Sequence, residues 1–514
     1  MFLKILMMAL FVVATIAIGF FTRKSATDVD GFVLGSRKVG PWLSAFAYGT
    51  SYFSAVVFIG YAGQFGWKYG MAALWIGLAN AFLGSLLAWY VLGARTRAMT
   101  HHLGAQTMPE FFGSRFNSRA LRIAAAAIIF IFLIPYTASV YNGLSRLFFM
   151  AFAVPYEYAI IVMALLTCIY VVLGGYMATA VNDFVQGCIM LVGIIAVIVA
   201  VLAGHGGFTE AVITLSQIPN DTTGTTGMQG AFTSMFGPDL INLLGVVILT
   251  SLGTWGLPQM VQKFYAIKNT SSIKRGAIIS TVFALVVAGG SYFLGGFGRL
   301  VASDVALAPN GIPVYDSVIP TLLSNMPDLL IGLTVVLVLS ASMSTLSSLV
   351  LTSGSTLTLD FIKGNFIKKM SERGQLLSMR ILIVVFVVIS AVIALVQYNS
   401  SVTFIAQLMS ISWGALAGSF LAPFLYGLYW KRVTTASVWA SFIFAIGLVC
   451  SNMVFGFIAS PINAGALAMV GGLVIVPLVS LITPAPNAEA TKRLFAESYA
   501  NLHEYPIDAD KLDR

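Results

Sequence analysis

Charged side chains are scarce in this chain. Asp, Glu, Lys and Arg make up 9% of its 514 residues, against about 25% in ordinary soluble domains. A soluble protein of this length would need far more charge on its surface, and 58% of the residues are hydrophobic. The composition therefore excludes a large soluble domain and predicts a polytopic membrane protein whose outer surface faces lipid.

Cysteine is also rare, and the usual patterns of catalytic residues are missing. Cys168, Cys188 and Cys450 lie far apart, each inside an apolar stretch, which gives neither a disulfide framework nor metal-ligand spacing. No apolar segment combines a nucleophile with a base, pairs two acids or forms a glycine-rich phosphate loop. We expect no enzymatic activity and no organic cofactor, so transport would draw on an ion gradient or on the solute's own gradient.

Long apolar runs are what the chain has in abundance. A helix of about 20 apolar residues crosses the hydrocarbon core of a bilayer, and thirteen such runs occur. The sequence thus predicts an all-α protein with about thirteen transmembrane helices, and a polar tail over 484–514. The runs cover 2–21, 41–65, 71–93, 123–148, 157–175, 183–203, 239–262, 277–297, 326–357, 379–398, 403–428, 435–457 and 463–483.

The positive charges predict the orientation of these spans. If the spans alternate in direction, 24 of the 28 Lys and Arg residues fall in segments on one side of the membrane. Cytoplasmic segments retain Lys and Arg, so the N-terminus is predicted outside and the C-terminus in the cytoplasm of a plasma (inner) membrane protein. The net charge of +9 is scattered over these segments, which favours contact with membrane lipids over binding of nucleic acid. No Lys or Arg is expected deep within a span.

Two spans depart from uniform apolarity. The second contains GTSYFSAVVFIGYAGQFG and the seventh contains TSLGTWGLPQ. Because these spans are five apart, they predict an inverted repeat in which a broken helix opens each half and the breaks form the binding sites. The predicted divisions are a peripheral first helix at 1–22, repeats at 23–205 and 239–433, an outer loop at 206–238, two peripheral helices at 434–483 and the cytoplasmic tail at 484–514.

The ninth span carries the densest polar cluster, LSASMSTLSSLVLTSGST. Hydroxyls in membrane helices often bond to their own backbone, which is the ordinary interpretation of any single one. Four of them in five residues, Ser344, Thr345, Ser347 and Ser348, indicate instead a site for a hard cation. Because no carboxylate is needed, a monovalent ion is favoured over a divalent one.

Asp183 is the one acid placed at the edge of a span within reach of the membrane. An ionisable group at such depth is a candidate for function. The alternative is that Asp183 caps the N-terminus of the sixth span, where its charge would suit the helix dipole. The sequence leaves both open.

With these motifs the chain resembles the sodium:solute symporter family, whose members carry proline, pantothenate, sugars, sialic acid and monocarboxylates. The resemblance runs from about residue 20 to 433. In its motifs the chain is most similar to the pantothenate, proline and monocarboxylate carriers. It implies a five-plus-five inverted-repeat core of the LeuT type that works by alternating access. The motifs that carry it, in order, are FVLGSRKVG, the broken second span, MPEFFGSRF, GGYMATAVNDFVQG, GLPQMVQKF, MSTLSS and LYWKR.

The resemblance also implies cation sites. The family's common sodium site maps onto the backbone carbonyls of Thr50, Phe53 and Ala341 and the side chains of Ser344 and Thr345. Some members, notably sialic acid carriers, hold a further sodium ion with two more hydroxyls and an acid. Those positions here are Ser347, Ser348 and Asp183, so a second cation is a hypothesis.

The nature of the solute is less specified. Proline carriers have an acid within the break of the second span, where this chain has Tyr52, and sugar carriers have a Glu-Gln pair where it has two valines. SYFSAVVFIG resembles the pattern of pantothenate carriers. A monocarboxylate, an amino acid such as proline or a pantothenate-like acid fits this chemistry. Candidate solute-binding residues are Tyr52, Val57, Thr254, Trp255, Gln259 and Gln407.

The sequence thus predicts a sodium-coupled symporter that imports a small organic solute. Proton coupling through Asp183 is a variant of this interpretation. A channel is disfavoured by broken helices that a bound ligand would close, and a membrane sensor by the lack of an output domain. The oligomeric state is open, with a monomer as one possibility.

Overall fold

A computed structural model describes residues 2–221, 226–309, 311–363, 366–367, 369–400, 405–500 and 502 of the chain. The described residues are almost entirely helical, and their only β-type pairings are two isolated bridges. One bridge joins Val39, just before the second predicted span, to Ile267, just after the seventh. The all-α class predicted from the apolar runs is therefore confirmed.

The first half of the chain contains the broken second span and three of the longest helical stretches. Its α-helices are α1 (Phe2–Thr22), α2 (Val29–Leu34), α3 (Pro41–Tyr52), α4 (Ala62–Tyr69), α5 (Leu74–Ala79), α6 (Ala94–His102), α7 (Met108–Arg115), α8 (Arg119–Phe152), α9 (Tyr156–Gly204) and α10 (Phe208–Gln217). The π-helical stretches η3 (Val56–Tyr61), η5 (Asn80–Leu87) and η6 (Trp89–Gly93) lie among them, with 3₁₀ turns η1 (Arg23–Ser25), η2 (Gly35–Arg37) and η4 (Gly70–Ala73).

The second half opens with the other broken span and ends in a helix beyond the last crossing. Its α-helices are α11 (Leu240–Gly256), α12 (Pro258–Ala266), α13 (Ser271–Gly295), α14 (Val318–Ser324), α15 (Asp328–Thr356), α17 (Glu372–Ser400), α18 (Ile405–Tyr429), α19 (Thr435–Phe455), α20 (Pro461–Ile482) and α21 (Ala488–Tyr499). Shorter pieces are η7 (Ala231–Thr233), η8 (Gly298–Asp304), η9 (Tyr315–Ser317) and the π-stretch η10 (Leu357–Ile362).

Ten helical stretches of the described chain are long and apolar enough to cross a membrane, or eleven if the bent pair α11–α12 counts as one span. The predicted number is thirteen, and the difference has a structural cause. Two stretches each contain parts of two predicted spans, Val56–His102 and α9. The 49 residues of α9 would form a rod about 74 Å long at 1.5 Å per residue, far longer than a bilayer core. Gly175, with φ +55° and ψ −145°, is where α9 turns.

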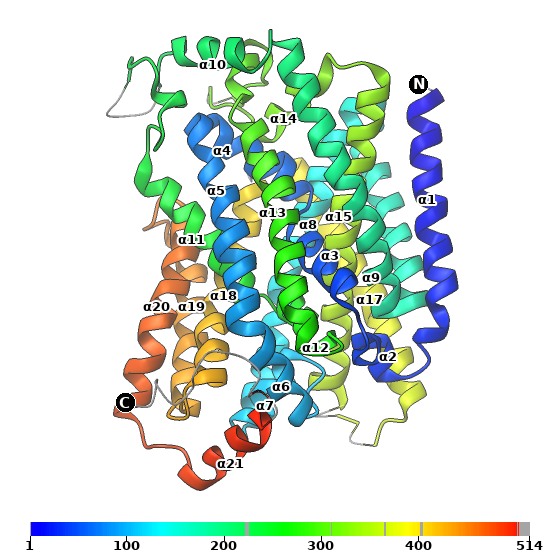
Figure 1. Cartoon of the computed structure of the whole chain (residues 1–514), viewed down its shortest axis with the longest axis vertical. Coiled ribbons are helices and arrows are strands. Elements are labelled where there is room, and N and C mark those ends of the chain that lie inside the picture. The colour runs from blue at the N-terminus through cyan, green and yellow to red at the C-terminus, as the bar shows by residue number, and fades with distance from the viewer. Residues whose placement is uncertain are drawn as a thin grey trace.

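The core is built around α15 and α18. Within their most apolar windows, 83% and 89% of the residues are buried inside the protein, against 17% for α1. In Figure 1, α3, α8, α9 and α15 gather in the middle, whereas α1 lies along one side and α19 and α20 along the other. An ion pair of 2.7 Å between Lys4 and Asp328 ties α1 to the start of α15. The broken helix α3 thus lies against the most buried part of the molecule.

The two ends of the molecule differ in their elements. Figure 1 shows α2, α6, α7, α12 and α21 at one end of the long axis and α4, α10 and α14 at the other. Of the first group, α2, α6, α7 and α21 belong to the basic segments 22–40, 94–122 and 484–514 of the sequence. The positive charges that the sequence assigns to one side therefore gather at one end of the fold.

Candidate functional site

The second predicted span is interrupted where its Gly, Ser and Thr residues cluster. Helix α3 ends at Tyr52, and Phe53 is extended with φ −86° and ψ 121°. The Ser54 hydroxyl accepts a hydrogen bond of 3.2 Å from the Val56 amide, which starts the next helical stretch. Carbonyls near the break therefore lose their helical partners and become available to a ligand inside the membrane.

Helix α15 presents two hydroxyls to these carbonyls. The Ser344 hydroxyl lies 3.1 Å from the Thr50 carbonyl and 3.0 Å from the Ala341 carbonyl. The Thr345 hydroxyl lies 3.1 Å from the Phe53 carbonyl and 3.3 Å from that of Thr50. All five residues are buried. The structure thus brings together the five residues that the family's common sodium site implies.

These five oxygens suit a small, hard, monovalent cation. Oxygens at right angles around a cation with metal–oxygen distances of about 2.4 Å lie about 3.4 Å apart, close to the separations observed here. The set contains three carbonyls and two hydroxyls and no charged ligand. A single positive charge could be neutralised there by dipoles alone, whereas a divalent ion would normally require carboxylates.

The seventh predicted span is broken in a matching way. Helix α11 ends at Gly256, Leu257 is extended, and Pro258 opens α12 after a bend of 43°. Every residue of α12 is buried, and Gln259, Gln262 and Lys263 share one side of it at helical spacing. This buried polar helix extends four residues beyond the predicted end of the span at 262.

Lys263 therefore corrects the expectation that no Lys or Arg lies deep in a span. Its side chain is 2% exposed, and its ammonium donates a hydrogen bond of 3.0 Å to the Ser348 hydroxyl. The Asp183 carboxylate, which is fully buried, lies 4.0 Å from the same ammonium. The sequence assigned Lys263 to an inner loop because apolarity falls at Gln262 and Lys263, although both residues continue the helix.

Asp183 lies two turns beyond the kink of α9 at Gly175 and therefore caps no helix end, so the capping alternative is wrong. Neither of its carboxylate oxygens has a hydrogen-bond partner among the described residues. The two hydroxyls predicted to share a second cation site with Asp183 make different contacts. Ser348 contacts Lys263, whereas the Ser347 hydroxyl donates to the Ser344 carbonyl of its own helix at 2.9 Å.

Two of the predicted solute-binding residues, Tyr52 and Thr254, line one small cavity between α3, η5, α11 and α13. Its volume is about 10 Å³, roughly what one water molecule needs. Asn80, which the sequence analysis missed, donates to the Tyr52 hydroxyl and accepts a hydrogen bond of 3.2 Å from Ser251. The only sequence signal for Asn80 is a lone amide in the apolar third span.

The other predicted solute-binding residues lie outside this cavity. Trp255 is near it, with its indole N–H donating to the Leu83 carbonyl at 3.0 Å. Val57 is fully buried, and Gln407 is half-buried on α18. Gln259 is 1% exposed, and neither atom of its amide has a hydrogen-bond partner among the described residues. An unsatisfied buried amide next to a helix break is a candidate for ligand binding.

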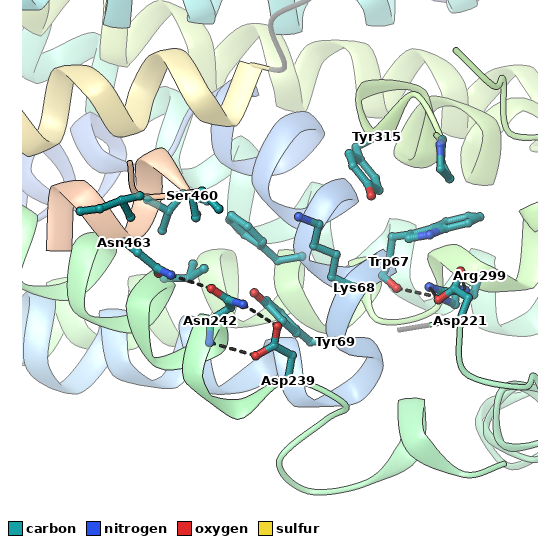
Figure 2. A pocket seen from close by; sticks show the side chains of 16 residues that line it. Trp67, Lys68, Tyr69, Asp221, Asp239, Asn242, Arg299, Tyr315, Ser460 and Asn463 are labelled. Carbon is teal, nitrogen blue, oxygen red and sulfur yellow. Dashed lines mark hydrogen bonds and ion pairs between the residues drawn. The ribbon is translucent and has the colours of Figure 1, made fainter. Parts of the chain in front are cut away.

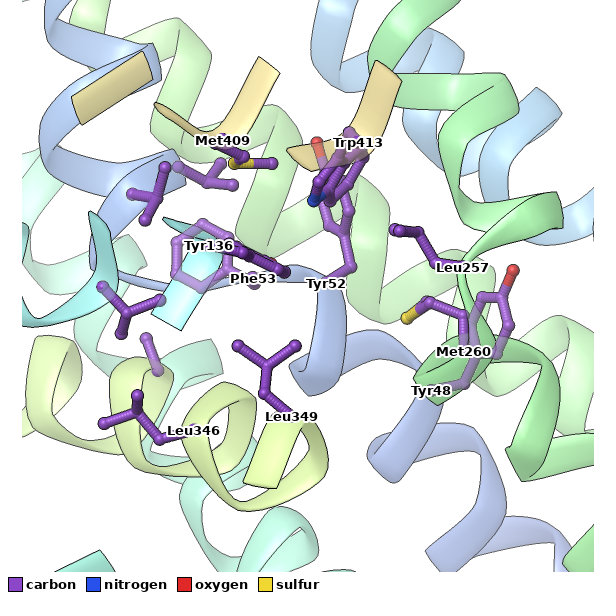
Figure 3. Packing of buried hydrophobic residues seen from close by; sticks show 14 of the residues in the cluster. Tyr48, Tyr52, Phe53, Tyr136, Leu257, Met260, Leu346, Leu349, Met409 and Trp413 are labelled. Carbon is purple, nitrogen blue, oxygen red and sulfur yellow. The ribbon is translucent and has the colours of Figure 1, made fainter. Parts of the chain in front are cut away.

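Aromatic side chains close over the break of the second span. Figure 3 shows Tyr52, Tyr136 and Trp413 grouped beside Phe53. The Trp413 ring lies 5.7 Å from that of Tyr52 and 5.9 Å from that of Tyr136, measured between centroids. Tyr136 and Trp413 were not predicted, since aromatic residues in apolar spans give no distinct sequence signal. Their rings bring α8 and α18 into contact with each other and with Tyr52 at the break.

Polar networks lie at both ends of the fold. At the end that carries α4, a cavity of about 450 Å³ is lined by groups including Lys68 and Asp239 (Figure 2) and contains none of the predicted site residues. At the other end, the Arg122 guanidinium lies 2.6 Å from buried Asp360 and 3.1 Å from Glu110. Glu110 belongs to the MPEFFGSRF motif, so this motif joins α7 to α8 and η10.

Burial also affects an acid in the segment that precedes α14. Asp316 is 4% exposed and accepts a hydrogen bond of 3.4 Å from the Ile405 amide at the start of α18. Burial raises the pKa of its carboxyl to about 6, while the positive charge of Arg146 and the Ile405 amide oppose that rise. Asp316 thus joins this segment to α18.

Comparison with known proteins agrees with this geometry. The model of the sodium:solute symporter family matches residues 32–445. The osmoregulated proline transporter OpuE of Bacillus subtilis is 28% identical over 96% of this chain and 97% of its own length. The sodium/proline symporter of Escherichia coli is 27% identical, with 96% of each chain covered.

Solved structures show the same fold. A substrate-bound, outward-open Na⁺-coupled sialic acid symporter superposes with a TM-score of 0.74 at 17% identity, over 95% of this chain and 99% of that one. Mhp1, a nucleobase-cation-symport-1 family transporter, superposes with a TM-score of 0.50 at 13% identity, over 90% and 97%. The chain belongs to the sodium:solute symporter family, as its motifs predicted.

Proposed function

We propose that this protein is a secondary active transporter that couples the inward movement of sodium to the uptake of a small organic solute. The observation that carries the proposal is the group of five buried oxygens from Thr50, Phe53, Ala341, Ser344 and Thr345. A cation in this group would join the break of α3 to α15. It would therefore favour the arrangement of the two helices in which the solute site is formed.

The proposed solute is a small amino acid or monocarboxylate, with proline as the first to test. The relatives described above are proline carriers, although Tyr52 stands where the family's proline carriers have an acid. The residues that line the cavity beside Tyr52 and Thr254 include polar ones such as Asn80. Its volume of about 10 Å³ is too small for such a solute, so the helices must separate to admit one. That requirement favours alternating access over an open channel.

The proposal includes the topology and division predicted from the sequence. We propose thirteen crossings, with α9 crossing twice through its turn at Gly175 and the break-containing spans leading two repeats at 23–205 and 239–433. An odd number of crossings puts the first residues of α1 and helix α21 on opposite sides of the membrane. Their positions toward opposite ends of the molecule support this proposal. The basic end would face the cytoplasm.

The test is uptake of labelled proline by proteoliposomes containing the purified protein, with and without an inward sodium gradient. Ser344→Ala and Thr345→Ala each remove one ligand of the proposed sodium site. Loss of a hydrogen bond or ligand to a charged group costs roughly 1.5–3 kcal/mol, so we expect the sodium concentration for half-maximal uptake to rise about 10- to 100-fold.

Ser342→Ala is the matched control, because Ser342 is buried on the same helix but its hydroxyl has no partner among the described residues. This variant should keep the wild-type sodium dependence. Equal sodium dependence in all four proteins would show that the site is wrong. Uptake that follows a proton gradient and ignores sodium would replace sodium with protons as the coupling ion. If proline is not taken up, a panel of small acids and amino acids under the same gradient identifies the solute.

A further inference from the structure

The surroundings of Lys263 raise a question about the number of coupling ions. Its ammonium lies at the meeting point of α3, α9, α12 and α15, where it contacts Ser348 at 3.0 Å and lies 4.0 Å from Asp183. The Tyr176 ring is 5.2 Å from the same nitrogen. Lys263 and Asp183 are each at most 2% exposed. Bulk water therefore screens neither charge.

The two charges depend on each other. Among the described residues, Asp183 has no other ion pair and no hydrogen bond, and Lys263 has no other ion pair. A buried carboxylate without a compensating positive charge is strongly unfavourable. The ammonium is thus the cation that balances Asp183 in this arrangement. At 4.0 Å the two groups are close enough for strong attraction without a direct hydrogen bond.

The hydrogen bonds show how the ammonium is held. The Ser51 hydroxyl lies 2.6 Å from the Ala47 carbonyl, to which it donates its single hydrogen. Ser51 therefore accepts the hydrogen of Ser348, which is 2.8 Å away. That leaves the Ser348 oxygen free to accept from Lys263. The chain of donors runs from the ammonium through two serines to the backbone of α3, just before its break.

The same groups are those that the family resemblance offers to a second sodium ion. Asp183 and Ser348 cannot serve the Lys263 ammonium and a sodium ion at the same time, because two positive charges a few ångströms apart in a buried site repel strongly. The remaining member, Ser347, has its hydrogen directed to the backbone of its own helix.

We propose that the Lys263 ammonium occupies the place of a second cation, as a positive charge covalently attached to α12, and thereby limits the transporter to one bound sodium ion. The proposal rests on the proposed function in assigning the remaining ion to the Ser344–Thr345 site. Because Lys263 lies on the inner half of the broken seventh span, this fixed cation would move with α12 during the transport cycle. Replacing its charge would then open a second sodium site.

The experiment measures how many sodium ions bind, using sodium alone as the probe. Purified protein in detergent is titrated with radioactive sodium, and bound ions per protein are counted at saturation. We expect one ion for the wild type and two for Lys263→Met. Lys263→Gln provides a second neutral variant should the methionine variant be unstable. Lys263→Arg, which keeps the charge, should bind one.

The double variant Lys263→Met with Asp183→Asn is the decisive control. It removes both charges, so the carboxylate that would attract the additional ion is gone, and the count should return to one. The stability of Lys263→Met should also depend more steeply on sodium concentration than that of the double variant, because ligand binding to the folded state stabilises it. The dependence of stability on sodium concentration can be measured even if Lys263→Met folds only in the presence of sodium.

The outcomes separate this proposal from the proposed function. Two ions in the wild type, or equal counts in Lys263→Met, Lys263→Gln and the double variant, would overturn the role of Lys263. A wild type that binds no sodium would overturn the Ser344–Thr345 site instead. A gain of one ion in Lys263→Met, absent from the double variant, would still support the proposal in that case.

Discussion

Ser51 stands between the two groups of polar residues at the break of α3. Its neighbour Thr50 offers a carbonyl to Ser344 at 3.1 Å, and its own hydroxyl pairs with Ser348 at 2.8 Å. One group is neutral and the other contains a full ion pair. Since both meet the same turn of α3, a change in one can alter the position of the other. Single residues near the break therefore deserve separate tests of sodium binding and solute binding.

Asn80 allows solute binding to be tested alone. Asn80→Ala removes the partner of both the Tyr52 and the Ser251 hydroxyls and leaves two buried polar groups unpaired, at roughly 1–3 kcal/mol each. We expect the KM for proline, or for the solute that the panel identifies, to rise at least about tenfold. Sodium binding without solute should stay as in the wild type, because Asn80 contacts none of the five proposed sodium ligands.

The matched control for this change is Asn452→Ala. Asn452 is also a buried asparagine in a membrane helix, but its amide contacts Ile458 in the loop after α19, far from the break along the chain. Its loss should lower stability without changing KM. An unchanged KM in Asn80→Ala would remove this residue and its small cavity from the solute pathway.

At the scale of helices, the outer half of the broken second span packs against α13 at glycines. A Cβ atom on Gly66 would lie 1.9 Å from the Gly295 carbonyl oxygen, and one on Gly295 would lie 2.1 Å from that of Ala62. Real Cβ atoms do not approach backbone so closely. The contact of α4 with α13 therefore needs glycine on both sides, as small residues allow in membrane helices generally.

We predict that Gly66→Ala pushes α4 away from α13 and destabilises the protein by about 1–3 kcal/mol, the usual cost of overpacking. The measurement is the melting temperature of the protein purified in detergent. Gly447→Ala is the control, since a Cβ at this helical glycine of α19 meets no atom within 4 Å. If both variants have the melting temperature of the wild type, the close crossing of α4 and α13 is incorrect.

The helix breaks and the first oxygen group were predictable because local chemistry determines them. Gly, Pro and hydroxyl residues within apolar spans mark places where backbone and side-chain oxygens become available, and Phe53 and Leu257 are extended where the sequence indicated breaks. Lys263 was not predictable in the same way. A lysine at the end of an apolar run is typical of a loop, and only the packing of α12 against α3 and α15 shows that Lys263 points inward.

Other differences have similar causes. Helix α9 contains two predicted spans because no loop separates them and the chain only turns at Gly175, where φ is +55° and ψ is −145°. Asn80, Tyr136 and Trp413 gain their importance from neighbours far away in sequence, such as Ser251 on α11. Predictions from a single chain recover local breaks and clusters, but not which distant residues pack over them.

At the scale of the whole molecule, charge and shape are related. The elements α2, α6, α7 and α21, which belong to basic segments of the sequence, gather at one end of the fold. Large apolar side chains such as Leu10, Val192 and Val388 are more than half exposed along the helices between the ends. A broad apolar belt of this kind suits lipid rather than water. The orientation of the protein in the membrane then follows from the rule that basic segments remain in the cytoplasm.

Two exposed serines on either side of α15 test this orientation. Ser303 lies in the segment before α14, and Ser371 lies in the basic segment before α17. In a variant whose three native cysteines are replaced by alanine, we predict that a membrane-impermeant maleimide labels Ser303→Cys in intact cells. Ser371→Cys should react only after the membrane is permeabilised, because one crossing separates it from Ser303. Labelling in the opposite order would invert the proposed topology, and labelling of both in intact cells would mean that α15 does not cross the membrane.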